Sequence, residues 1–252
     1  MSFLVLAFDS SIASGSVLLD CKSIVDSGVA TQSGDGYVLD SRMKWLVGAF
    51  TQGATITRAQ VQTPKFNLTA YQELAPLQTS MPGAGAKPAF LDFTKAGRAL
   101  NLTETIIAQT INGNASAENE RVGLWIADGP IAPVAKEHFT IRFTGSTTLV
   151  ADAWSTVTMT LDRNLQAGKY DIIGARLKSA GGILFRVAIP GFNFRPGGIA
   201  SQSDDAIDID GQRHGGWGVW GTFEQNLLPT FDVLSSSADT SQSGELDLVG
   251  PY

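Results

Sequence analysis

The stretch Ser155-Thr156-Val157-Thr158-Met159-Thr160-Leu161 alternates strictly between polar and apolar side chains. In an extended chain, Val157, Met159 and Leu161 share one face, and the three threonines share the other. Successive side chains of a β-strand point to opposite faces of the sheet, so this pattern suits a strand with one buried face and one wetter face. Threonine is β-branched and fits such a surface well. The stretch therefore predicts a half-buried strand.

The same period of two recurs elsewhere in the chain. In 139–144 the aromatic and aliphatic side chains fall on one face, and in 183–189 Ile183, Phe185, Val187 and Ile189 do the same. Further strands are predicted at 3–8, 44–51, 54–62, 101–111, 121–127, 170–178, 216–224 and 230–234. Many short strands without amphipathic helices predict an all-β, antiparallel sandwich or barrel and disfavour a parallel α/β fold. The segment 15–26 also suits a short helix, and this alternative stays open.

Composition narrows the class of protein. The chain has 252 residues, of which only 17% are charged, against about 25% in an ordinary soluble domain. Its 18 basic and 24 acidic residues give a net charge of −6, which argues against direct binding of nucleic acid. Cys21 is the only cysteine, so neither an intrachain disulfide nor a cysteine-based zinc site can form. A weakly charged, turn-rich chain suits a surface that is covered by neighbouring molecules.

The chain is long enough for two small sandwiches, and the polar stretch 112–120 is the best boundary between them. We therefore predict an N-terminal sandwich over 1–118 and a C-terminal sandwich over 119–252. The first contains a Gly/Pro-rich loop at 79–88, which is too irregular for a strand. The second is predicted to end in an extended, acidic, Ser-rich tail at 235–252.

The sequence contains no recognisable catalytic motif. His138 and His214 are the only histidines, and neither lies in a G-x-S-x-G or HExxH motif. We expect His138 to flank a strand and His214 to lie in a turn with Gly215. A pair of carboxylates for glycoside hydrolysis is not singled out among the 24 acids. The sequence therefore predicts a protein that is not an enzyme.

An acidic cluster is the best metal candidate. Its four members are Asp204, Asp205, Asp208 and Asp210. Oxygen-rich loops suit Ca²⁺, but the EF-hand template fails because it would place Ala206 at position one and Trp217 at position twelve. We expect a solvated face or loop, with a structural Ca²⁺ site as the alternative. No other cofactor is expected.

The most distinctive string is Gly216-Trp217-Gly218-Val219-Trp220-Gly221-Thr222-Phe223-Glu224. If it forms one strand, Trp217, Val219 and Phe223 face the core, whereas Trp220 faces outward. An outward tryptophan suits a bound sugar, packing under a second layer of chain or burial at a subunit interface. Phe192 and Phe194, in the glycine-rich loop 191–198, pack inward or reach a neighbouring molecule. Trp220, Phe192 and Phe194 are therefore the interface or ligand candidates.

Four strings carry a resemblance to a known family: 44–50 (KWLVGAF), 56–64 (ITRAQVQTP), 216–224 and 229–234 (PTFDVL). Together with the strand pattern and the length, they resemble the jelly-roll capsid proteins of tailless icosahedral viruses. The similarity is greatest to the small double jelly-roll major capsid proteins of prokaryotic viruses. The resemblance implies two jelly-roll sandwiches side by side in each subunit, and three subunits in each pseudo-hexagonal capsomer.

The resemblance also implies the function. We expect a structural protein that self-assembles into the capsid shell of a bacteriophage virion through homotrimers. Its partners would be itself and other capsid proteins, with an internal viral membrane as a further candidate and no direct contact with nucleic acid. The alternative is a lectin-like or spike-associated β-sandwich that binds a carbohydrate or receptor through Trp220.

Overall fold

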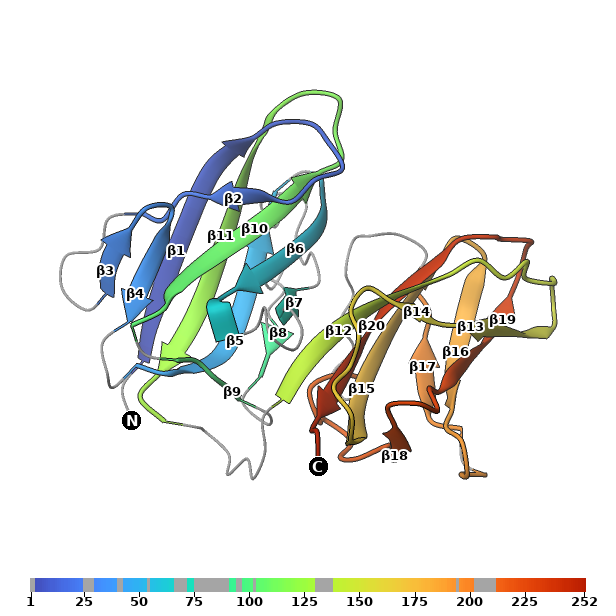
Figure 1. Ribbon diagram of the computed structural model, residues 1–252. Helices are drawn as coiled ribbons and strands as arrows, with labels where there is room; N and C mark the ends of the chain where they lie inside the picture. Colours follow the sequence, from blue (N-terminus) through green and yellow to red (C-terminus); the bar gives the residue numbers. More distant parts are fainter. Residues whose placement is uncertain are drawn as a thin grey trace, which may run out of the picture. The chain divides into compact units, whose positions relative to one another are not determined.

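The computed structural model describes residues 3–24, 30–39, 43–53, 55–65, 72–74, 91–93, 97–101, 103–129, 138–193, 195–201 and 212–252. These residues form antiparallel β-sheets, as the alternating sequence predicts (Figure 1). Within these ranges, no helix has the length and hydropathy needed to cross a membrane. The segment 15–24, which suited a short helix, instead holds a three-residue strand and irregular chain. The predicted loop at 79–88 lies outside the described residues.

The chain divides into two compact units, which meet in sequence at Glu137 and His138. We refer to the described residues before this point as unit 1 and to the described residues from His138 onward as unit 2. The division therefore falls after the predicted boundary at 118. The polar stretch 112–120 instead contains the connection between two strands of unit 1, because the strand that follows it pairs with the first strand of the chain.

Unit 1 contains two sheets. One is five-stranded, in the order β1 (Phe3–Ile12), β11 (Glu118–Ala127), β5 (Trp45–Gln52) and β8 (Leu91–Asp92), with β9 (Arg98–Ala99) also on β5. The other is six-stranded, in the order β3 (Ala30–Ser33), β4 (Gly36–Leu39), β10 (Thr105–Asn112), β6 (Ile56–Gln62) and β7 (Gln72–Leu74), with β2 (Leu19–Cys21) also on β10. Within each sheet, every pair of neighbouring strands is antiparallel.

Unit 2 repeats this plan. Its five-stranded sheet has the order β14 (Thr160–Leu161), β12 (His138–Gly145), β20 (Gln242–Val249), β15 (Lys169–Ser179) and β18 (Gly221–Glu224). Its four-stranded sheet has the order β13 (Trp154–Thr158), β19 (Thr230–Ser235), β16 (Gly182–Ala188) and β17 (Gly197–Ile199).

The strand order identifies each unit as a jelly roll. In unit 2, leaving the short β14 aside, the strands are first, eighth, third and sixth in one sheet and second, seventh, fourth and fifth in the other. Unit 1 gives the same orders when β2, β3 and β4 count as the second strand and β8 and β9 as the sixth. The chain thus passes between two sheets in the double Greek key of a jelly roll. The fold is all-β, with a jelly-roll β-sandwich in each unit.

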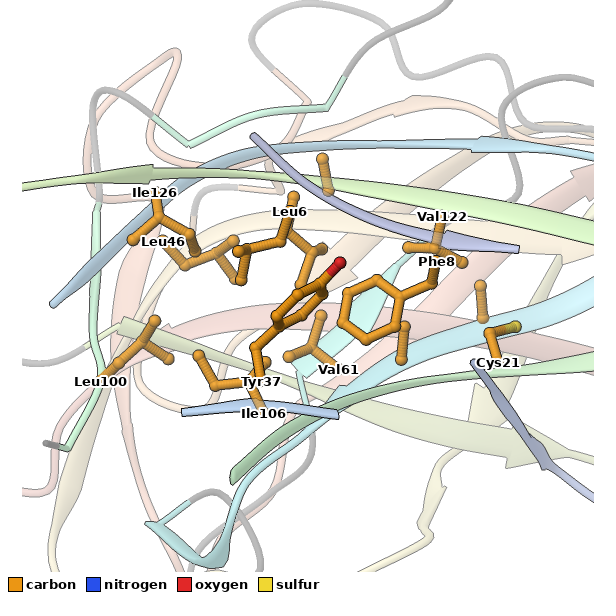
Figure 2. Packing of buried hydrophobic residues seen from close by; sticks show 14 of the residues in the cluster. Leu6, Phe8, Cys21, Tyr37, Leu46, Val61, Leu100, Ile106, Val122 and Ile126 are labelled. Carbon is orange, nitrogen blue, oxygen red and sulfur yellow. The ribbon is translucent and has the colours of Figure 1, made fainter. Parts of the chain in front are cut away.

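The core of unit 1 lies between its two sheets. Figure 2 shows Phe8 from β1 beside Tyr37 from β4, and their rings meet edge to face with centroids 5.2 Å apart. Leu46 and Ile126 pack nearby, and both are fully buried. Burial of such side chains is the main source of stability in a sandwich of this size.

The core of unit 2 is more aromatic. Phe143 on β12 stacks on Phe231 of β19 with ring centroids 4.6 Å apart, and Phe185 on β16 lies 5.6 Å from the same ring. The alternation around Val157 is confirmed, since Val157 and Met159 are buried. In 183–189 the inward residues are buried except Ile183, which is 40% exposed because the strand pairing shifts between Gly182 and Leu184.

The prediction of an extended C-terminal tail is wrong. Residues 242–249 form β20, which lies between β12 and β15 in the middle of a sheet. Leu246 and Leu248 face the core and are almost fully buried. Glu245 and Asp247 alternate with them on the other face. Because these two residues are charged, the sequence alone suggested an acidic tail in place of a strand.

The prediction of one strand over 216–224 is also wrong in its first half. Gly218 has a positive φ angle of 77°, which interrupts an extended strand, and the chain just before it turns at His214 and Gly215, with φ angles of 58° and 78°. Strand β18 begins only at Gly221. The alternation is consequently displaced: Phe223 is buried as predicted, whereas Trp217 is 58% exposed.

Candidate functional site

Two polar features of unit 2 are the candidates for function. The first is a buried cluster of charged side chains beneath residues 212–220, which we call the strap. The strap lies against the outer face of the five-stranded sheet, where the Ala175 amide donates to the Gln212 carbonyl (2.7 Å) and the Trp220 amide donates to the Ile172 carbonyl (2.7 Å). Gly174 permits this close approach, since a Cβ there would lie 2.5 Å from the Arg213 Cα.

Arg213 connects the strap to the sheet. Its guanidinium donates to both carboxylate oxygens of Asp247, from Nε at 3.0 Å and from Nη2 at 3.0 Å. Its Nη1 also donates to Glu245 Oε2 at 2.7 Å. Arg176 on β15 lies on the other side of Glu245, with Nη1 3.8 Å from Oε1. Two cations and two carboxylates therefore neutralise one another beneath the strap.

Both histidines of the chain also meet Asp247. His138 Nε2 lies 3.7 Å from Oδ1, and His214 Nδ1 lies 3.3 Å from Oδ2. The His214 backbone amide and the Thr140 hydroxyl donate to the same carboxylate, at 3.1 Å and 2.5 Å. Burial alone would raise the pKa of Asp247, but the charges of Arg213 and His214 and the nearby His138 imidazole outweigh it. They hold the pKa well below its usual value.

The donor set of this cluster suits an ion-pair network better than a metal site. His138, His214 and Asp247 offer ligand atoms that all lie within 4.8 Å of one another. A cation placed among them would have to displace Arg213, whose guanidinium already occupies both oxygens of Asp247. A bidentate pair between arginine and carboxylate is strong and directional. The cluster therefore fastens the strap to the sheet.

The second feature is a cleft of about 590 Å³ on the outer face of the four-stranded sheet. Its floor is a row across three strands, in which Asp232 of β19 pairs with Thr156 of β13 on one side and with Arg186 of β16 on the other. Trp154 and Phe192 line its sides, and they are 42% and 41% exposed.

Asp232 orients two arginines in this cleft. Its Oδ2 accepts from Arg186 Nε at 2.9 Å and from Arg195 Nη1 at 3.3 Å, while its Oδ1 accepts from the Thr156 hydroxyl at 2.8 Å. The Arg186 guanidinium also lies over the Trp154 ring, 4.2 Å from its centroid. The carboxylate is almost fully buried, whereas the side chains of Arg186 and Arg195 remain 37% and 45% exposed. The floor thus carries one net positive charge.

The predicted site residues have different outcomes in the structure. Trp220, expected to face outward, is only 9% exposed and stacks on Trp217 with centroids 6.2 Å apart. The expected outward orientation is therefore wrong, and its role at an interface or with a ligand stays a prediction. Phe192 lies at the cleft. His138 begins β12 and His214 lies in a turn, as expected. The remaining candidates, Phe194, Asp204, Asp205, Asp208 and Asp210, lie outside the described residues, and the calcium site stays a prediction.

Sequence reasoning missed Trp154 and Asp232. The available signal was the polar face of 155–161, because a tryptophan two residues before Thr156 continues that outward face. The meeting of Asp232 with Arg186 and Arg195 had no signal, since strand register between distant segments brings them together.

Comparison with known proteins supports the fold. The major capsid protein P2 of bacteriophage PM2 is similar in structure, with a TM-score of 0.50 and 13% sequence identity, covering 100% of this chain and 97% of that one. A xanthan lyase from Paenibacillus gives a TM-score of only 0.23 at 12% identity and covers 25% of that chain, which is too low to bear on this protein. No protein-family model and no curated protein matches the sequence. The likeness to P2 extends over both units and confirms the jelly-roll fold.

Proposed function

We propose that the chain is a structural subunit of a viral capsid, and that the virus infects a prokaryote. The observation that carries this proposal is the likeness to the PM2 major capsid protein over the whole chain, with two jelly rolls in one polypeptide. A fold alone does not fix a function. The low content of charge and the apolar side chains on the outside of the sandwich add independent support.

The outer face of unit 1 carries such an apolar patch. Val5 of β1 lies directly opposite Trp125 of β11, and the Phe3 ring meets the Trp125 ring edge to face at 6.4 Å. Phe3, Val5 and Trp125 are 49%, 37% and 37% exposed. Apolar surface that is gathered in this way typically marks an interaction surface, and aromatic residues are enriched in interfaces.

In the proposed assembly, three copies form a trimeric capsomer with six jelly rolls around the threefold axis. Capsomers then join one another and other capsid proteins to close the shell of the virion. We infer a structural rather than a catalytic role, because the two histidines, Glu245 and Asp247 are engaged in fastening the strap. Direct binding of nucleic acid is not expected from a chain with a net charge of −6.

Light scattering of the purified chain tests this proposal. We expect a mass of three times 26.7 kDa or larger assemblies. Val5→Lys should reduce the assembled fraction because it places a charge in the apolar patch. Ser11→Lys is the matched control, since Ser11 faces outward on the same strand beyond the patch and is exposed. A mass of 26.7 kDa at all concentrations would overturn the proposal.

A further inference from the structure

The cleft of unit 2 has features that shell formation does not require. Arginine has five N–H donors, and Asp232 engages one donor of Arg186 and one of Arg195. The side chains of both arginines are more than a third exposed, so their other N–H groups face solvent or the cleft. Asp232 and the Trp154 ring hold Arg186 in place, which lowers the entropy cost of binding an anion.

The shape and lining of the cleft restrict the ligand. A volume of about 590 Å³ lies within the range of small-molecule sites. Trp154 and Phe192 present partly exposed rings, against which the C–H face of a sugar can pack. The Thr156 and Thr230 side chains also line the cleft and bring hydroxyl groups that suit the hydroxyls of a sugar.

The charge favours a single carboxylate over a phosphate polymer. Two arginines and one aspartate leave one net positive charge, whereas a nucleic acid needs a longer basic track. The guanidinium fork matches the planar geometry of a carboxylate. We propose that the Trp154–Arg186–Arg195 cleft binds an acidic saccharide, with the arginines holding its carboxylate and the aromatic rings packing against its sugar ring.

Calorimetry on the full chain with digalacturonate as the probe tests this proposal. Digalacturonate should bind at least about tenfold more tightly than the neutral galactose disaccharide, because hydrogen bonds from arginine to a charged carboxylate are stronger than those to a neutral hydroxyl. Arg195→Gln should weaken binding about tenfold, while Asp232 keeps Arg186 and Thr156 as partners. Trp154→Ala should weaken the binding of both saccharides, the acidic and the neutral one.

Arg121→Gln is the matched control, because Arg121 is 47% exposed and pairs with Asp9 at 3.3 Å in unit 1. This variant removes the same charge and should leave binding unchanged. No binding of digalacturonate, equal binding of the neutral disaccharide, or an equal effect of both arginine variants would overturn the proposal. Tighter binding of inorganic phosphate would overturn it in favour of a phosphate site. The mass measured by light scattering tests the capsid role separately.

Discussion

Units 1 and 2 share a strand order, but they accommodate buried acids in different ways. In unit 1, Glu120 lies on the inner face of β11 with Val122 and Leu124, and no described basic side chain forms an ion pair with it. In unit 2, Asp247 lies on the outer face of β20 and is buried by the strap, where Arg213 pairs with it. The same topology therefore holds one acid without a counterion and another within a network.

The pKa values of the two acids express this difference. Burial raises the pKa of Glu120, with the Thr110 side chain partly offsetting it and Glu118 adding to it. The charges around Asp247 lower its pKa despite complete burial. The comparison teaches that burial in a jelly-roll core without a counterion raises the pKa of a carboxyl group, and that the outer face buries an ionised carboxylate only with its partners.

The largest effect is expected for Asp247→Ala. This variant leaves Arg213, whose side chain is 2% exposed, without its main partner, and the loss of one member of a buried pair costs about 3–5 kcal/mol. Urea unfolding followed by tryptophan fluorescence measures the change in the free energy of unfolding. Asp9→Ala in unit 1 is the control, because its partly exposed pair with Arg121 contributes at most about 1 kcal/mol. Equal losses in the two variants would contradict the comparison.

Acid should weaken unit 2 through the same carboxylate. The folded-state pKa of Asp247 lies below the ordinary value of 3.8, so its contribution to stability is present above that value and is lost as the pH falls through the folded pKa. The urea midpoint of the wild type should therefore fall in this acidic range. Asp247→Asn should lose less stability over the same range, and a slope as steep as that of the wild type would show that other groups control acid unfolding.

A smaller loss of stability is expected when the hydroxyl of either buried tyrosine is removed. In unit 1 the Tyr37 hydroxyl lies between the carbonyls of Ala7 and Ile24, which share its single proton. In unit 2 the Tyr170 hydroxyl donates to the Gln166 carbonyl at 2.9 Å. Tyr170→Phe should cost about 1 kcal/mol, and Tyr37→Phe should cost more, up to about 3 kcal/mol, because two carbonyls lose the proton that they share. Urea denaturation of both variants measures this, and the reverse order would be inconsistent with these contacts.

The smallest effect is expected for Glu120→Gln. Unlike the variants above, it should not lower the free energy of unfolding at neutral pH. The folded-state pKa of Glu120 lies above its ordinary value of 4.5, so its contribution is present below 4.5 and is lost as the pH rises through the folded pKa. At neutral pH the amide should be neutral or stabilising by about 1 kcal/mol, since it removes a charge that burial disfavours. Thermal unfolding at neutral and acidic pH measures the difference, which should shrink on acidification. A clear loss of stability at neutral pH would mean that a partner stabilises the ionised form of Glu120.

Much of the fold could be predicted from the sequence because most strands have one apolar face. The alternation in 139–144 and 155–161 needs only local information, and the structure confirms both regions as strands. Strand β20 escaped prediction because its outward face carries Glu245 and Asp247, which resemble a solvated tail until their partners are known. The boundary at Glu137 escaped because β11 completes unit 1 by pairing with β1, over a hundred residues earlier.

The sites were less predictable than the strands, because local turns and strand register between distant segments decide which side chains meet. Trp220 was expected to be outward from an alternation over 216–224 that the positive φ angle of Gly218 interrupts. Phe192 was identified because an aromatic residue in a glycine-rich loop is conspicuous in a sequence. The arginines that accompany it were not, since Arg186 and Asp232 meet only through the register of β16 with β19.

Cryo-electron microscopy of the purified, concentrated chain tests the central claim most directly. The account predicts closed oligomers in which three copies contribute six β-sandwich lobes around a threefold axis, and larger shells built from these oligomers. The apolar patch of Phe3, Val5 and Trp125 should be covered by a neighbouring copy. Particles that contain a single copy with two lobes, at every concentration, would contradict it.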